Sequence, residues 1–369
     1  MRTFGRTSLL AIAALVAGCG DDVADAASGD VAVDGGGVAD GAAADADAGG
    51  DAAIDDVTSD VGIDTGEPIE WPPPTRTYDF IVTAFGFDVP EGLAEAGERI
   101  ENPCGLDLST NNTRYTPLVL DGLVVDGFDL DGEDGQGDGP CAHTDYAGPD
   151  GAPGVDYGFL HVMDMIRPAR PGQTIETVLA SAPSQGLIRI GIRLTDVDDL
   201  ENDDDVRLIV TNLTETPLLG ADGRPLAGGS VPALDEPEFQ SELPGAIVDG
   251  TLFAGPADLV MGHINLLVIE DRVVALRDAR IRATVTERAS GGLEVDGLVH
   301  GWWERESMIE AIGYAVTTIG ANPGELECVL DAYADHSLDG ETCNTMSTIL
   351  QVRAVSGFIT GLDDTTGGE

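Results

Sequence analysis

The sequence predicts a mainly β protein: an antiparallel β-sandwich of the jelly-roll kind, with helical insertions and a disordered acidic tether in front of it. Several segments alternate apolar and polar residues with a period of two, which is typical of strands with one buried face. Three stretches have helical spacing instead. Residues 20–70 contain 13 Asp, 12 Ala and 10 Gly, too few apolar side chains to form a core.

The first eighteen residues have the features of an export signal. Arg2 and Arg6 precede a short apolar run that ends in Ala17-Gly18-Cys19. This run is shorter than the ~20 residues needed to span a bilayer. The ending resembles a bacterial lipobox, which implies cleavage before Cys19 and acylation of that cysteine. Gly20 follows in place of the Asp associated with inner-membrane retention, so we expect a lipid anchor in the outer membrane, on either face.

Residues 19–74 are predicted to be the lipidated cysteine and an extended tether. Residues 20–70 carry a charge of −15, from 13 Asp and 2 Glu with no Arg, and this charge favours extended conformations. The whole chain has a formal charge of −49 and every one of its 18 cationic residues is Arg. A nucleic-acid partner is excluded, because such proteins need a basic surface.

The body is expected to span residues 75–362, with a disordered tail at 363–369. Its strands are predicted, in order, at 78–87, 118–128, 187–194, 206–210, 264–269, 272–276, 278–286, 295–302 and 349–359, with a hairpin turn at Glu270-Asp271. Apolar residues at helical spacing predict helices at 159–166, 309–319 and 322–333. Asn322, Pro323 and Glu325 suit the start of the last one. The second and third helices form a predicted insertion at about 303–337.

Four cysteines remain after Cys19. An even number in an exported chain favours disulfides, and four cysteines allow three pairings. We expect neighbours to pair, Cys104 with Cys141 and Cys328 with Cys343, since each bond then closes a locally irregular segment. Metal binding by these cysteines is the weaker alternative, because no Cys-x-x-Cys pair is present and His is sparse.

Two acidic loops are the candidate binding sites. In the first, closely spaced Asp and Gly residues offer the oxygen ligands that Ca²⁺ prefers, and the predicted ligands are Asp129, Asp131, Asp134, Asp138 and Asp156. The alternative is a solvated acidic loop. The second joins two strands and contains Asp196, Asp198, Asp199, Asp203 and Asp205. For this loop a solvated hairpin tip is the favoured interpretation.

No catalytic residue is predicted. The chain has no Gly-x-Ser-x-Gly, no His-Glu-x-x-His and no phosphate-binding glycine loop, and its five His are isolated in sequence. Trp302-Trp303 could offer one aromatic face to a sugar, although two core positions are the favoured interpretation.

Part of the body resembles a known type of protein. The spacing Cys141-x3-Asp145-x3-Pro149-Asp150-Gly151-x2-Gly154-Val155-Asp156 is similar to a motif of uncharacterised acidic secreted lipoproteins of myxobacterial type. The acidic turn at 199–206 and a cysteine pair spanning a helix, like Cys328 and Cys343, are also similar. The resemblance covers about 115–360 and departs from the family at Tyr157, where Asn is expected. It implies localisation and fold, and no activity.

The function predicted from these observations is that of a lipid-anchored, non-catalytic binding or structural module, with Ca²⁺ as a stabilising ion. Its ligand could be a glycan or a protein, and the oligomeric state is not predicted. The alternative is a calcium-supported hydrolase or lectin-like protein that acts on polysaccharide or cell-wall material.

Overall fold

The computed structural model describes residues 75–90, 122–132, 141, 143–166, 179–221, 223–264, 272–289, 291–318 and 323–362. The chain divides into two units, 1–69 and 70–369, and every described residue belongs to the second. The predicted signal peptide, Cys19, the tether and the tail lie outside the described residues.

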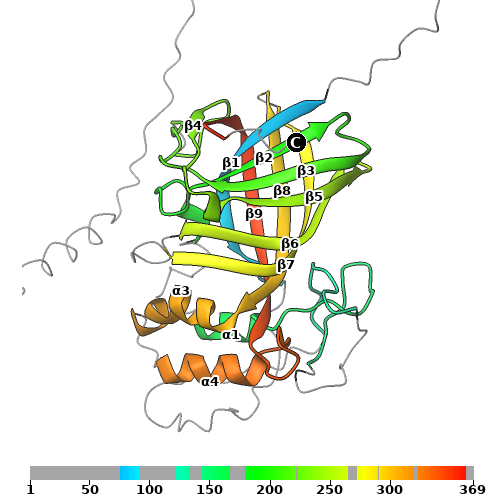
Figure 1. Ribbon diagram of the computed structural model, residues 1–369, viewed down its shortest axis with the longest axis vertical. Helices are drawn as coiled ribbons and strands as arrows, with labels where there is room; N and C mark the ends of the chain where they lie inside the picture. Colours follow the sequence, from blue (N-terminus) through cyan, green and yellow to red (C-terminus); the bar gives the residue numbers. More distant parts are fainter. Residues whose placement is uncertain are drawn as a thin grey trace, which may run out of the picture. The chain divides into compact units, whose positions relative to one another are not determined.

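Strands dominate the second unit (Figure 1). Helices are few and short. In chain order the elements are β1 (Arg76–Phe87), α1 (Leu160–Ile166), β2 (Ile190–Val197), β3 (Asp203–Asn212), β4 (Ser230–Pro232), the 3-10 helix η2 (Pro237–Phe239), β5 (Ser241–Val248), β6 (Thr251–Ile264), β7 (Arg272–Glu287), β8 (Leu293–Glu304), α3 (Arg305–Thr318), α4 (Pro323–Tyr333) and β9 (Thr345–Thr360).

The sheet closes on itself, so the predicted sandwich is wrong. The strands pair in the order β1-β2-β3-β5-β6-β7-β8-β9, and β9 pairs again with β1, from Asp79↔Gly357 to Phe87↔Leu350. The result is an eight-stranded antiparallel barrel. β4 adds a short parallel pairing beside the end of β9. Closure pairs both edges of the sheet, which a sandwich leaves unpaired.

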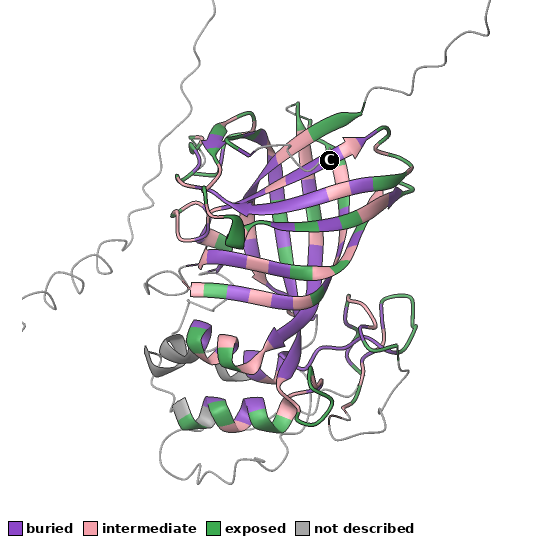
Figure 2. Ribbon diagram, in the orientation of Figure 1, coloured by how far each residue is buried: buried purple, intermediate pink, exposed green. Residues whose placement is uncertain are grey.

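The barrel interior is the hydrophobic core. Buried and more exposed residues alternate along the strands (Figure 2), as the period-two pattern predicts. In β7, Ala279, Ile281 and Ala283 are buried, whereas Arg282 is only partly buried. The interior side chains leave an apolar cavity of about 40 Å³ in the middle of the barrel.

One end of the barrel is closed by helices and aromatic rings. α1, α3 and α4 lie at this end (Figure 1), with α3 packed against β7 and β8. The ring of Phe159, just before α1, lies 4.5 Å from that of Phe87 and 5.9 Å from that of Trp303. These three residues come from the ends of β1 and β8 and from the helical segment. They therefore form a dry plug.

The outer face of the barrel is also buried where β4 and the end of β9 cover it. Arg193, in the strand predicted at 187–194, is only 7% exposed and forms an ion pair with Asp79 at 2.7 Å. Its remaining N–H groups donate to the carbonyls of Ile359 and Leu362. The alternation of β2 is therefore confirmed, but its second face is not solvated here.

The predicted helices are confirmed as α1, α3 and α4, and most predicted strands are confirmed. The strand expected at 118–128 is wrong for residues 122–128, which contain only the isolated bridge Val124↔Ala147. The strand predicted at 264–269, apart from Ile264, and the predicted turn at Glu270-Asp271 lie outside the described residues. None of the helices in the described ranges is long and apolar enough to cross a membrane.

Candidate functional site

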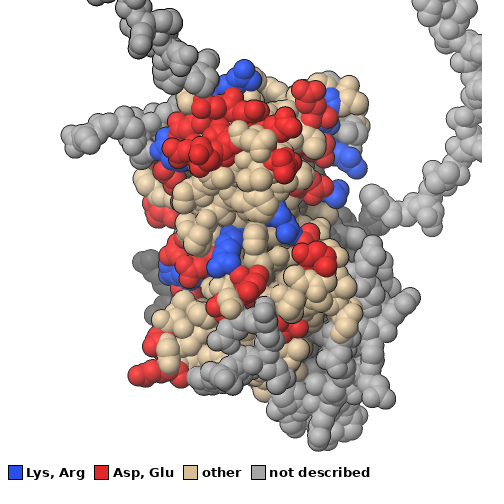
Figure 3. Space-filling model, turned by 90° about the vertical axis from the view of Figure 1, so that its right-hand side faces the viewer, with Lys and Arg blue, Asp and Glu red and all other residues tan. Residues whose placement is uncertain are grey.

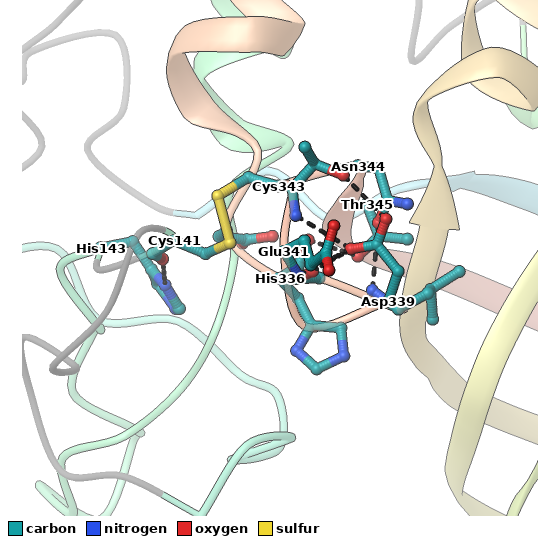
Figure 4. Close-up of a disulfide and its surroundings, with 12 residues drawn as sticks. Cys141, His143, His336, Asp339, Glu341, Cys343, Asn344 and Thr345 are labelled. Carbon is teal, nitrogen blue, oxygen red and sulfur yellow. Dashed lines mark hydrogen bonds between the residues drawn. A yellow bond between two sulfur atoms is a disulfide. The ribbon is translucent and has the colours of Figure 1, made fainter.

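A disulfide ties the irregular segment 122–158 to the start of β9. Cys141 is bonded to Cys343, with a Cα–Cα distance of 5.4 Å, although 202 positions separate them (Figure 4). The predicted pairings Cys104–Cys141 and Cys328–Cys343 are therefore wrong. Cys328 is disulfide-bonded too, and Cys104 lies outside the described residues. Local proximity in sequence failed as a guide because the fold brings distant segments together.

His143 lies beside this disulfide and contacts two carboxylates. Its Nε2 is 2.7 Å from Oδ1 of Asp156 and 3.1 Å from Oδ1 of Asp145. Its Nδ1 is 3.1 Å from the carbonyl oxygen of Cys141, to which it donates a hydrogen bond. The exposed fraction of the Asp156 side chain is 0% and that of Asp145 is 2%. The contact is therefore a buried charge cluster rather than a surface ion pair.

Asp156 is held from both sides. While Oδ1 faces His143, Oδ2 accepts a 2.6 Å hydrogen bond from the backbone N–H of Leu130. Asp131, one residue further on, is exposed and points a carboxylate oxygen to the same place. One ligand atom from each of Asp131, His143 and Asp156 lies within 4.8 Å of the other two. This is a spacing that a metal ion could bridge.

The predicted calcium ligands lie in different places. Asp131 and Asp156 lie close together, with ligand atoms within 4.8 Å of each other. Asp129 is not part of the group, since its Oδ1 accepts the N–H of Gly132 at 2.6 Å and closes a turn. Asp134 and Asp138 lie outside the described residues. His143 was missed, although Cys141, His143 and Asp145 stand at alternate positions in a short segment.

The electrostatics of the cluster favour a charged imidazole. Burial opposes that charge, but the hydrogen bond to Asp156 and the nearby carboxylate of Asp335 outweigh it and raise the pKa of His143 to about 10. Asp335 is itself buried, and burial raises its pKa to about 6. Its Oδ1 accepts the N–H of Ser347 at 2.9 Å, and its Oδ2 accepts the Ser347 hydroxyl and the N–H of Gly158.

The other histidines near this end have structural contacts. His300 is fully buried, its Nδ1 accepts the N–H of Phe128 at 2.9 Å, and burial lowers its pKa to about 3. His336 stacks on Trp302 at 4.3 Å, and His161 stacks on Tyr333 at 3.8 Å. Burial lowers the pKa of both, that of His161 to about 4. The neutral rings of His161 and His300 act here as packing groups.

The second acidic loop lies at the opposite end of the barrel and is organised by its own backbone. The carboxylate of Asp203 accepts N–H groups of Asp198, Asp199 and Asp205, the first at 2.6 Å. Asp196 pairs with Arg207 at 2.7 Å. These predicted residues therefore do not converge on one ion. Most of them stabilise the β2–β3 hairpin.

This hairpin forms part of a mouth. The β2–β3, β5–β6 and β7–β8 turns share the end where β1 begins and β9 ends. A pocket of about 370 Å³ lies between them. Its rim carries four exposed carboxylates and its floor three apolar side chains: Asp199, Glu201, Asp249 and Glu287, and Leu200, Val285 and Leu293. Figure 3 shows acidic side chains gathered at this end of the barrel.

Val285 lines both the mouth pocket and the central cavity. The cavity is lined by apolar side chains and glycine alone, so it offers no hydrogen bond to water. At the other end the aromatic plug closes the barrel.

The aromatic platform considered for a sugar ligand is not present. Trp302 is 2% exposed and Trp303 is 0% exposed, and the indole N–H of Trp303 donates to Ser307. Both residues are core, as favoured from the sequence. No protein-family model, curated protein or solved structure matches this chain.

Proposed function

We propose that this protein is a membrane-tethered, non-catalytic binding module whose mouth pocket takes a molecule with a positive charge and an apolar part. Attachment through acylated Cys19, in the outer membrane, belongs to the same proposal. The observation that supports it best is the mouth itself, where four exposed carboxylates and three apolar side chains line one pocket.

The size of the pocket suits a small ligand. Small-molecule sites have volumes of about 300–1,000 Å³, and the mouth pocket falls in this range. The central cavity, at about 40 Å³, has room only for the end of an apolar chain. The ligand is therefore expected to sit mainly in the mouth, with an apolar group against Leu200, Val285 and Leu293.

The rim selects for charge. A unit positive charge about 6 Å from one carboxylate gains about 0.7 kcal/mol in water, and four carboxylates multiply this before salt screens it. The neighbouring Arg288 is already paired with Glu294 at 3.5 Å. The carboxylate of a fatty acid is repelled by the same rim. We expect a long-chain amine to bind at least about tenfold more tightly than a carboxylate of equal length.

The test compares decylamine with decanoate, both below their micelle concentrations, by calorimetry on the full chain. The rim variant Glu201→Gln/Glu287→Gln should weaken amine binding and bring the two affinities together. Glu215→Gln/Glu238→Gln is the matched control, because it removes two exposed charges from the β3–β5 connection that do not line the mouth pocket. Equal binding of amine and carboxylate, or equal loss in both variants, would refute the proposal.

A further inference from the structure

The structure places one imidazole and two carboxylates around a single point at the helix-capped end of the barrel, far from the acidic rim. We propose that Asp131, His143 and Asp156 bind a divalent metal ion of the zinc class, which fastens the 122–158 segment to the barrel. The proposal does not depend on the function of the mouth pocket.

The imidazole is oriented as a metal ligand. The Nδ1–H group of His143 donates to the backbone carbonyl of Cys141 at 3.1 Å, which fixes the ring and directs Nε2 to the carboxylates. Metal-binding histidines characteristically use their second nitrogen in this way. The Cys141–Cys343 disulfide holds that carbonyl in place (Figure 4).

The carboxylates are also placed in advance. Asp156 is fully buried and its second oxygen is occupied by the N–H of Leu130, so one oxygen remains directed at His143. Asp131 is exposed and supplies the ligand from the solvent side. Asp145, whose Oδ1 lies 3.1 Å from Nε2 of His143, is not one of the three converging ligands. A water molecule would fill the fourth position of a tetrahedral site.

The charges around His143 call for a further cation. The side chains of Asp145, Asp156 and Asp335 are buried here, and Asp131 adds a fourth carboxylate at the surface. The nearby Arg280 donates to the backbone carbonyls of Asp129 and Leu130 instead. A bound dication would offset two of these negative charges. Buried charges are stable only when they are paired in this manner.

The nitrogen ligand favours zinc over calcium. Ca²⁺ takes six to eight oxygen ligands, whereas imidazole together with carboxylate suits Zn²⁺ and its neighbours in the first transition series. Zinc–ligand distances of about 2.0–2.2 Å require the ligand atoms to lie about 3–4 Å apart. Separations within 4.8 Å reach this range after small side-chain movements.

The position of the site explains what the ion would do. Within its described residues, the segment before α1 contains only isolated bridges, such as Tyr146↔Val155, and no strand of its own. A metal ion joining Asp131 to Asp156 would close this segment upon itself, beside the disulfide that fastens it to β9. Metal binding to such a site contributes directly to folding.

The experiment uses the full chain, purified without reductant, alkylated and stripped with a chelator. We expect one equivalent of Zn²⁺ to bind and to raise the melting temperature more than the same concentration of Ca²⁺. Co²⁺ should give the visible absorption of a tetrahedral site. Asp131→Asn should weaken zinc binding at least tenfold, since even outer partners of metal ligands are worth 10–100-fold. Asp131 is exposed, so this variant is expected to fold.

Asp129→Asn is the matched control. It removes the same charge two positions away, and its amide oxygen can still accept the N–H of Gly132. Its zinc affinity should stay within about twofold of the parent protein. The proposal is overturned if zinc does not bind, if calcium stabilises equally, if bound Co²⁺ shows no tetrahedral absorption, or if Asp131→Asn and Asp129→Asn have the same affinity.

Discussion

Replacing Cys141 and Cys343 together by Ser should lower the free energy of unfolding by several kcal/mol. The disulfide joins residues 202 positions apart, and closing a loop of that length in an otherwise open chain is worth about 5 kcal/mol. Cys328 is disulfide-bonded as well, so a second cross-link already shortens the loop that the Cys141–Cys343 bond closes. We therefore expect a loss of about 3–4 kcal/mol.

The connectivity can be checked before stability is measured. No Arg lies between Arg305 and Arg353, so trypsin leaves Cys328 and Cys343 on one peptide. A second cleavage at Asp331, Asp335 or Asp339 separates them. Under non-reducing conditions, mass spectrometry should then find Cys343 linked to the peptide of Cys141. A Cys328–Cys343 link after the second cleavage would contradict the structure.

Stability is then compared by denaturant unfolding of the full chain, with and without the double substitution, at one pH and without reductant. The transition of the variant should move to lower denaturant concentration. An unchanged midpoint would mean that the bond does not constrain the unfolded chain, and the loop-closure reasoning would fail.

Three further results are expected. Burial raises the pKa of Asp335 to about 6, so the folded state favours the protonated carboxyl. As the pH rises from 4 to 6, the free energy of unfolding should therefore fall by up to about 3 kcal/mol. In denaturation curves, Asp335→Asn should remove this pH dependence. Gly297→Ala should destabilise by about 1–3 kcal/mol, since its Cβ would lie 2.4 Å from that of Ala283, whereas Gly86→Ala meets no atom within 4 Å. Cys19→Ser should abolish labelling by a fatty-acid analogue and release the protein from the outer-membrane fraction.

The strands could be predicted from the sequence, but their closure could not. Alternation in segments such as 278–286 reports one apolar face, and a sandwich and a barrel satisfy that pattern equally well. A barrel differs from a sandwich by the pairing of β1 with β9, and no local sequence pattern predicts that pairing. Arg193 shows the same limit, because its burial depends on chain from Ile359 to Leu362.

The candidate sites also contain some residues that the sequence predicts and others that it does not. Asp131 and Asp156 could be found because closely spaced acids between glycines predict a cation loop. His143 could not be predicted, because an isolated histidine in sequence gives no sign of the buried carboxylates that the fold places beside it. The mouth pocket was not predicted at all, since its rim comes from three hairpins far apart in the chain.

The pairing of β1 with β9 also governs the order of events in folding. Asp79 meets Gly357 only after the intervening chain has been made, so the barrel cannot close until its last strand is present. Contacts this distant in sequence slow the search for the native state, and both strand edges stay open to intermolecular pairing meanwhile. The whole chain has a formal charge of −49, so complete chains that have not yet closed the barrel repel one another during that interval. The acidic composition thus protects the protein while it is still assembling.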